Sequence, residues 1–180
     1  MRLIFLDIDG VIATDRTYKA WRAAKCPDTF EAYVGLIDPN LVADINQFAI
    51  DVGAGIVVSS SWRHDDVCPH PVDDVLRAAG FTVPIVDHTP VLGVPVEWRY
   101  KLKHRGYEIN AYVVEHNLSL DSFVVFDDDM GATGCPIDTP IRHGSRVIFT
   151  PESTGVSPGH IRRARKLFGL PYVQVAADPA

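Results

Sequence analysis

Short, unbroken apolar runs that alternate with helical segments constrain this fold more than any other feature of the sequence. Four of them, residues 3–6, 55–58, 123–126 and 146–149, lack a polar/apolar alternation, as is typical of strands buried on both faces. A weaker run at residues 81–86 is broken by Pro84, which favours a position near the sheet edge.

Helical signals fall between these runs. Asp38 and Pro39 provide a capping residue and a first-turn proline ahead of an amphipathic stretch that reaches Val52. Further helices are predicted over residues 71–79, 107–117 and 158–168. Strands that alternate with helices at this spacing predict an α/β fold with a mainly parallel sheet. We expect a Rossmann-like three-layer α/β/α sandwich of about five strands.

The length of 180 residues suits one domain spanning residues 1–180. Its main excursion is a polar and aromatic insertion, or flap, at residues 13–37. The stretch from 63 to 104 is largely used by a helix and a strand, so we expect a small cap or none, and a site open to a bulky substrate.

Composition limits the class of partner. The chain carries 23 acidic and 17 basic residues, a formal charge of −6, which disfavours stable binding of duplex nucleic acid. The three cysteines show no paired spacing, and no apolar run approaches the roughly 18 residues of a membrane span. We therefore expect a cytoplasmic protein without a membrane partner; its oligomeric state is not predicted.

Acidic and hydroxyl side chains follow three of the predicted strands. Ligands bind beyond the carboxyl ends of strands in open α/β sheets, so the residues at these ends are the candidate site. They are Asp7, Asp9 and Gly10 after the first run, Ser59, Ser60, Ser61, Trp62 and Arg63 after the second, and Asp127, Asp128 and Asp129 after the third. Carboxylates from different strands form the hard oxygen cage that Mg²⁺ prefers.

Asp7 and Asp9 are separated by one residue and followed by Gly10. If the chain turns at Gly10, the two carboxyl groups suit a nucleophile beside a proton shuttle. The alternative interpretation is a strand end that simply runs into a turn.

Five motifs together resemble one family. Leu6–Val11, with its Asp-x-Asp-Gly core, resembles the signature of haloacid dehalogenase-like (HAD) phosphatases. Four more stretches, residues 59–63, 105–109, 126–129 and 155–157, resemble the HAD domain of "Swiss Army Knife" RNA repair proteins. The resemblance covers essentially the whole chain, and the order of the motifs makes it far more specific than any one of them.

The resemblance implies a role for each matching residue. Asp7 would attack phosphorus and form an aspartyl-phosphate, while Asp9 would protonate the leaving oxygen and later activate water. Ser59, with Ser60 as a close competitor, would hold a phosphoryl oxygen. Arg105 would neutralise the phosphoryl group, although Arg99, Lys101 and Lys103 lie nearby and a solvated basic turn is the alternative.

The implied cofactor is Mg²⁺. Its ligands would be Asp7, the backbone carbonyl of Asp9, and Asp127, with Asp128 completing or supporting the set. Gly10, Ser60, Trp62 and Arg63 are expected to contact the substrate, Trp62 by stacking on a nucleobase or by packing the insertion onto the core.

Other polar clusters favour ordinary explanations. The segment from His64 to His70 contains potential ligands but fits no zinc spacing, so a helix-entry loop is the better interpretation. The basic run at residues 162–166 lies opposite apolar positions and is better explained as a solvated helix face.

The sequence thus predicts a Mg²⁺-dependent phosphomonoester hydrolase. Its substrate would be a phosphorylated small molecule such as a nucleotide, or a nucleic-acid terminal phosphate. Two alternatives stay open: a metal-dependent nuclease, since clustered aspartates also serve phosphodiester cleavage, and a catalytically silent, receiver-like Mg²⁺-binding module.

Overall fold

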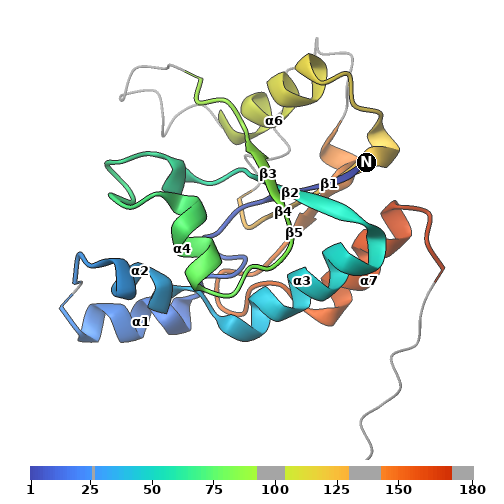
Figure 1. The fold of residues 1–180 in the computed structure, drawn as a ribbon. Helices are drawn as coiled ribbons and strands as arrows, with labels where there is room; N and C mark the ends of the chain where they lie inside the picture. Colours follow the sequence, from blue (N-terminus) through green and yellow to red (C-terminus); the bar gives the residue numbers. More distant parts are fainter. Residues whose placement is uncertain (26, 93–103, 130–142, 172–180) are drawn as a thin grey trace, which may run out of the picture.

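A five-stranded parallel sheet organises the computed structural model (Figure 1), which describes residues 1–25, 27–92, 104–129 and 143–171. The strand order is β3-β2-β1-β4-β5, and every neighbouring pair is parallel. The strands are β1 (Arg2–Leu6), β2 (Ala54–Val58), β3 (Ile85–His88), β4 (Phe123–Asp127) and β5 (Val147–Phe149). The predicted α/β class and five-stranded sheet are confirmed.

The register of the three central strands brings their carboxyl ends level with one another. Leu6 at the end of β1 lies opposite Val58 of β2 and Phe126 of β4. The pairing continues one residue further, because the Ser59 amide donates to the Leu6 carbonyl and the Asp7 amide donates to the Phe126 carbonyl. Asp7, Ser59 and Asp127 therefore lie side by side at the carboxyl ends of these three strands.

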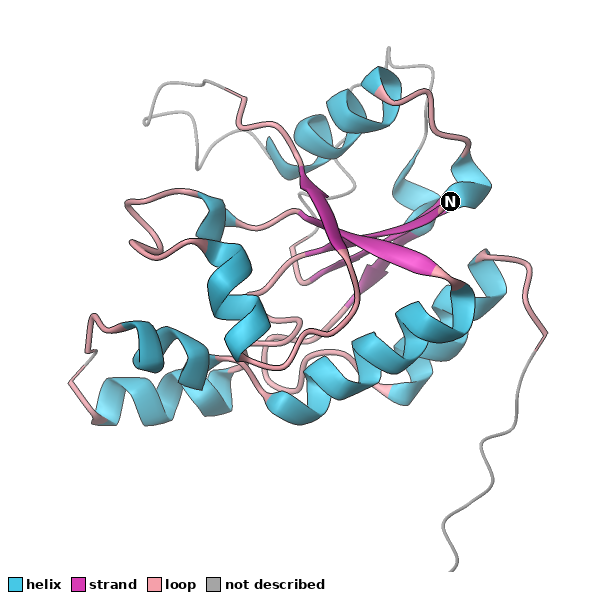
Figure 2. Ribbon diagram, viewed as in Figure 1, coloured by secondary structure: helices cyan, strands magenta, loops and turns pink. Residues whose placement is uncertain are grey.

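Helices lie on both faces of the sheet (Figure 2), and a hydrophobic cluster covers each face. Alternate β1 side chains divide between them: Ile4 and Leu6 face one cluster, whereas Leu3 and Phe5 face the other. The first cluster includes α3 (Pro39–Val52), α4 (Val72–Ala78) and α7 (Pro158–Leu167), and the second includes α6 (His104–Glu115). Burial of both sheet faces explains why these strands lack polar alternation.

The insertion at residues 13–37 folds into two short helices that were not predicted. They are α1 (Asp15–Ala23), preceded by the Thr14 cap, and α2 (Phe30–Leu36), whose Thr29 side chain accepts from the Ala32 amide. Ala13 forms isolated bridges with both Asp9 and Ile37, so the insertion leaves and rejoins the core beside the first strand end. Its aromatic residues pack against the first hydrophobic cluster.

Three further differences from the sequence predictions concern the starts of β3 and α6 and the presence of short 3₁₀ helices. β3 begins after Pro84, because proline cannot donate to a ladder, and it lies at the predicted edge of the sheet. α6 begins at His104, earlier than expected, so Arg105 is in its first turn. The structure also contains short 3₁₀ helices that were not predicted, namely η1 (Ser61–Arg63), η2 (Leu120–Ser122) and η4 (His143–Arg146). Arg99, Lys101 and Lys103 lie outside the described residues, as does most of any cap between β3 and α6.

Within the described part of the chain, every helix is too short or too polar to cross a bilayer.

The side-chain amide of Asn46 provides a test of the packing between α3 and the α4–β3 connection. It donates to the Gly80 carbonyl at 2.8 Å and accepts from the Thr82 amide at 3.1 Å. We expect Asn46→Leu to lower the free energy of unfolding by about 2 kcal/mol, because it removes two hydrogen bonds between a buried side-chain amide and the backbone. Urea denaturation measures this. Gln47→Leu is the matched control, since the Gln47 side chain bonds to Asp51 at an exposed position, and an equal loss in both variants would contradict the assignment.

Candidate active site

Three carboxylates converge at the carboxyl ends of β1 and β4. One oxygen from each of Asp7, Asp127 and Asp128 lies within 4.8 Å of the others. Asp7 and Asp127 are buried, and each carboxylate is held by a backbone amide: Ile8 donates to Asp7 at 2.7 Å and Asp129 donates to Asp127 at 2.8 Å. Backbone geometry therefore fixes the two buried acids, whereas Asp128 is half-buried.

Burial and repulsion from neighbouring carboxylates raise the pKa of all three acids. For Asp7, burial raises the pKa and nearby Arg105 partly offsets it. For Asp127, burial and the Asp7 charge raise the pKa well above its ordinary value. Burial together with Asp7 and Glu152 raises the pKa of Asp128 to about 7. A cation among these oxygens would relieve the repulsion.

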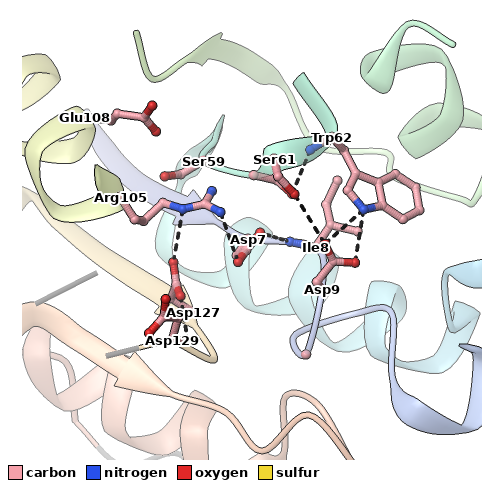
Figure 3. A network of polar contacts seen from close by, with 12 residues as sticks. Asp7, Ile8, Asp9, Ser59, Ser61, Trp62, Arg105, Glu108, Asp127 and Asp129 are labelled. Atoms are coloured by element: carbon pink, nitrogen blue, oxygen red, sulfur yellow. Dashed lines mark hydrogen bonds and ion pairs between the residues drawn. The ribbon is translucent and has the colours of Figure 1, made fainter. Parts of the chain in front are cut away.

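Arg105 lies between the two buried acids (Figure 3). Its Nη2 is 3.5 Å from Asp7 Oδ2, and its Nε is 3.7 Å from Asp127 Oδ2. Burial lowers the pKa of Arg105, but the charges of Asp7 and Asp127 outweigh that effect and raise it. Its Nη1 is buried and finds no hydrogen-bond partner among the described residues. A buried guanidinium with an unused donor beside two acids suits an anionic ligand.

The donor set fits Mg²⁺. All three candidate ligands supply carboxylate oxygens, which hard cations prefer, and Asp127 Oδ2 is buried without a hydrogen bond in the described structure. Gly10 allows the close approach of Asp128. A Cβ at Gly10 would lie 2.2 Å from Asp128 Oδ2, and its φ of +64° favours glycine. The Thr150 hydroxyl, which donates to the Gly10 carbonyl at 2.8 Å, fixes this turn.

Asp9 points away from the other acids and toward Trp62 (Figure 3). The Trp62 ring N–H donates to both Asp9 oxygens, at 3.0 and 3.1 Å, and the Tyr18 hydroxyl donates to Oδ1 at 2.6 Å. The Trp62 side chain is 2% exposed, so most of its ring is covered by protein. Its predicted stacking on a nucleobase stays a prediction, and the geometry favours a contact with Asp9.

Both candidate phosphate-binding hydroxyls are fully buried next to the strand end. Ser60 lowers the pKa of Asp7 by hydrogen bonding to it, and its oxygen also accepts from the Trp62 amide at 3.4 Å. Ser59 instead lies 3.5 Å from the Thr89 hydroxyl. The structure thus brings Ser60 closer than Ser59 to the predicted nucleophile.

The structure places Arg63 in a different setting from the predicted substrate contact. Its guanidinium donates to the carbonyls of Ser60 and Thr89, and Nη2 lies 2.7 Å from Glu108 Oε2. The side chains of Arg63 and Glu108 are 4% and 9% exposed. Burial lowers the pKa of Arg63 while Glu108 counteracts it. These contacts favour a supporting role that ties the second strand end to α6.

Sequence reasoning missed Tyr18, Glu108 and Thr150. Only Glu108 carried a usable signal, because it follows Arg105 by three residues and thus shares its helix face. The segment from His64 to His70 forms no metal-ligand group in the described structure, where the three aspartates are the one cluster of that kind. The segment lies between η1 and α4, outside any helix or strand, as expected of a loop that leads into a helix.

A comparison with known protein families identifies the family of this chain. The family model described as the HAD domain in Swiss Army Knife RNA repair proteins matches residues 3–160. The chain therefore belongs to the HAD domains of that family, as the sequence motifs indicated. Searches of curated proteins and of solved structures gave no match.

The raised pKa of Asp128 predicts how stability depends on pH without metal. The folded-state value of about 7 exceeds the ordinary 3.8, so folded protein binds this proton more tightly than unfolded protein. The contribution of Asp128 to the free energy of unfolding is fully present below about pH 4 and is lost as the pH rises toward 7. In EDTA at pH 8, we expect Asp128→Asn to raise Tm by a few degrees, because it removes the repulsion. At about pH 4 the two proteins should melt alike; a lower Tm for the variant at pH 8 would contradict the repulsion.

A second prediction distinguishes a structural role of Arg63 from a role in substrate binding. If the Arg63–Glu108 pair is structural, Arg63→Met should lower the free energy of unfolding by about 3 kcal/mol, because a buried charge loses its partner. Glu108→Met should be costly as well, and the double variant should cost less than the sum of both. Urea unfolding of all four proteins completes the cycle. Unchanged stability of Arg63→Met combined with a raised KM would instead assign Arg63 to substrate binding.

Proposed function

We propose that this protein is a Mg²⁺-dependent phosphomonoester hydrolase that works through an aspartyl-phosphate. The observation that carries the proposal is the guanidinium of Arg105, held at 3.5 Å from Asp7 with a buried, unused donor beside the acidic cluster. Phosphoryl transfer depends on positioning and on neutralising charge more than on new covalent chemistry. Arg105 and the acids supply both functions next to a carboxylate nucleophile.

In this mechanism Asp7 is the nucleophile. The Ile8 amide holds its Oδ1, while Oδ2 lies on the side of Arg105. A phosphoryl group bound here would meet the free Nη1 of Arg105 and a hydroxyl from Ser59 or Ser60. Mg²⁺ held by Asp7, Asp127 and Asp128 would neutralise phosphoryl charge. Asp9 would give a proton to the leaving oxygen and later take one from water.

For the substrate we propose a nucleotide or a nucleic-acid terminal phosphate. The support is the family description, which places related domains in RNA repair proteins. The formal charge of −6 is compatible with recognition of an end, because gripping a duplex along its length calls for a basic face. Since fold and family do not determine substrate, this part of the proposal has its own test.

The nucleophile is tested by Asp7→Asn. We expect phosphate release from 4-nitrophenyl phosphate to fall by about 10³-fold or more, because an amide cannot replace the attacking carboxylate. The control is Asp44→Asn, an equivalent change on α3 away from the site, which should retain wild-type activity. Thermal melting establishes that both variants are folded. A folded Asp7→Asn protein with wild-type turnover would rule out the mechanism.

The substrate is tested with a matched panel. Phosphate release is measured from 3′- and 5′-phosphorylated mononucleotides, oligonucleotides and small sugar phosphates, in EDTA and after addition of Mg²⁺. The proposal expects Mg²⁺-dependent release of inorganic phosphate, fastest from nucleotides or oligonucleotide ends. Shorter oligonucleotides without free phosphate would favour the nuclease. No release from any compound, together with a Mg²⁺-induced rise in Tm, would favour the silent binding module.

A further inference from the structure

Hydrogen-bond donors contact both oxygens of the Asp9 carboxyl group. Tyr18 Oη lies 2.6 Å from Oδ1, Trp62 Nε1 lies 3.0 and 3.1 Å from the two oxygens, and Ser61 Oγ lies 3.5 Å from Oδ2. Both oxygens of this half-buried carboxyl group are therefore engaged. Donors on both oxygens fix the rotation of the side chain.

These donors come from two separate segments that pack against each other. Tyr18 is on α1 of the insertion, and Trp62 is on η1 after β2. Trp21 packs edge-on against Tyr18 at 6.1 Å between ring centroids, and Tyr33 of α2 packs edge-on against Trp62 at 5.5 Å. The aromatic packing holds the hydroxyl and the indole N–H in place, so their geometry around Asp9 is preorganised.

We infer that Tyr18 and Trp62 are positioning residues that orient the Asp9 carboxyl and stabilise the negative charge it acquires while protonating the leaving oxygen. The inference rests on the proposed function. In the step concerned, an Asp7 oxygen bonds to phosphorus and the bond from phosphorus to the leaving oxygen breaks. The electron pair stays on that oxygen, and the Asp9 proton moves onto it, leaving Asp9 as a carboxylate.

The two donors interact more strongly with Asp9 as its charge develops. An interaction that strengthens in the transition state lowers the barrier, whereas one of constant strength does not. The benefit exists only when the leaving group needs the proton. An alkoxide is a poor leaving group and requires protonation, but 4-nitrophenolate departs without it. The role of Tyr18 and Trp62 should therefore depend on the leaving group, which a purely structural role would not.

The test compares kcat/KM for an alkyl phosphate, glycerol phosphate, with that for 4-nitrophenyl phosphate. This parameter stops at departure of the leaving group, so later hydrolysis of the intermediate does not enter it. We expect Tyr18→Phe and Trp62→Phe each to lower the alkyl value by about 10- to 100-fold, since each removes a hydrogen bond to a charged group. The nitrophenyl value should change less than about threefold.

A matched variant controls for the loss of a tyrosine hydroxyl elsewhere in the insertion. Tyr33→Phe removes a hydroxyl that bonds the Val67 carbonyl and keeps the ring that packs against Trp62. This hydroxyl does not contact Asp9 in the described structure, so the control should keep the wild-type ratio of alkyl to nitrophenyl kcat/KM. Thermal melting checks folding, and Tyr18→Phe decides the matter if Trp62→Phe does not fold.

The outcomes separate this inference from the proposed function. A fall confined to the alkyl substrate in Tyr18→Phe supports it. An equal fall for both substrates, or no fall, overturns it while leaving the phosphatase proposal in place. If wild-type protein releases phosphate from neither substrate, nor from the nucleotide panel, the proposed function fails and this inference fails with it.

Discussion

Repulsion among buried carboxylates is the constraint on which this site depends. Asp7 and Asp127 are almost wholly removed from water, and Asp128 approaches them closely. Arg105 is the cation that contacts the buried pair in the described structure, and it lies at ion-pair distances rather than in short hydrogen bonds. One guanidinium cannot balance three carboxylates, so the remaining repulsion must be relieved by protonation or by a further cation. In the proposed function, a bound Mg²⁺ would supply that cation.

The sheet determines which acids meet. Asp7 and Asp127 follow strands whose register keeps their ends level, and backbone amides orient both carboxylates. Side-chain contacts position the other residues of the site. Gly10 leaves room for Asp128, and the ion pair with Glu108 ties Arg63 to α6. Glu108 also raises the pKa of Arg105 by its charge. A single acidic residue on the first turns of α6 therefore connects the second strand end to the cation of the site.

The sheet and the acids at its strand ends were predictable from sequence, because buried parallel strands form unbroken apolar runs and their ends mark the ligand edge. The partners of those acids were not. α1 and α2 are short, and their stability comes from aromatic packing that a helical pattern does not reveal. Trp62 was expected either to stack on a base or to pack the insertion onto the core, and its orientation toward Asp9 depends on how the insertion folds back. Arg63 was expected to face the substrate, and only the folded helix α6 reveals its buried partner.

The insertion gives the two sides of the site different properties. On the Arg105 side, buried atoms retain unused hydrogen-bonding capacity, namely Arg105 Nη1 and Asp127 Oδ2. On the insertion side, Asp9 has donors on both oxygens. In the proposed function, unused capacity would suit the phosphoryl group and Mg²⁺, whereas a fully engaged carboxyl would suit a group that must keep one orientation through proton transfer. A short insertion can therefore organise the acid without forming a large lid, because it needs only two donors and the aromatic packing that holds them.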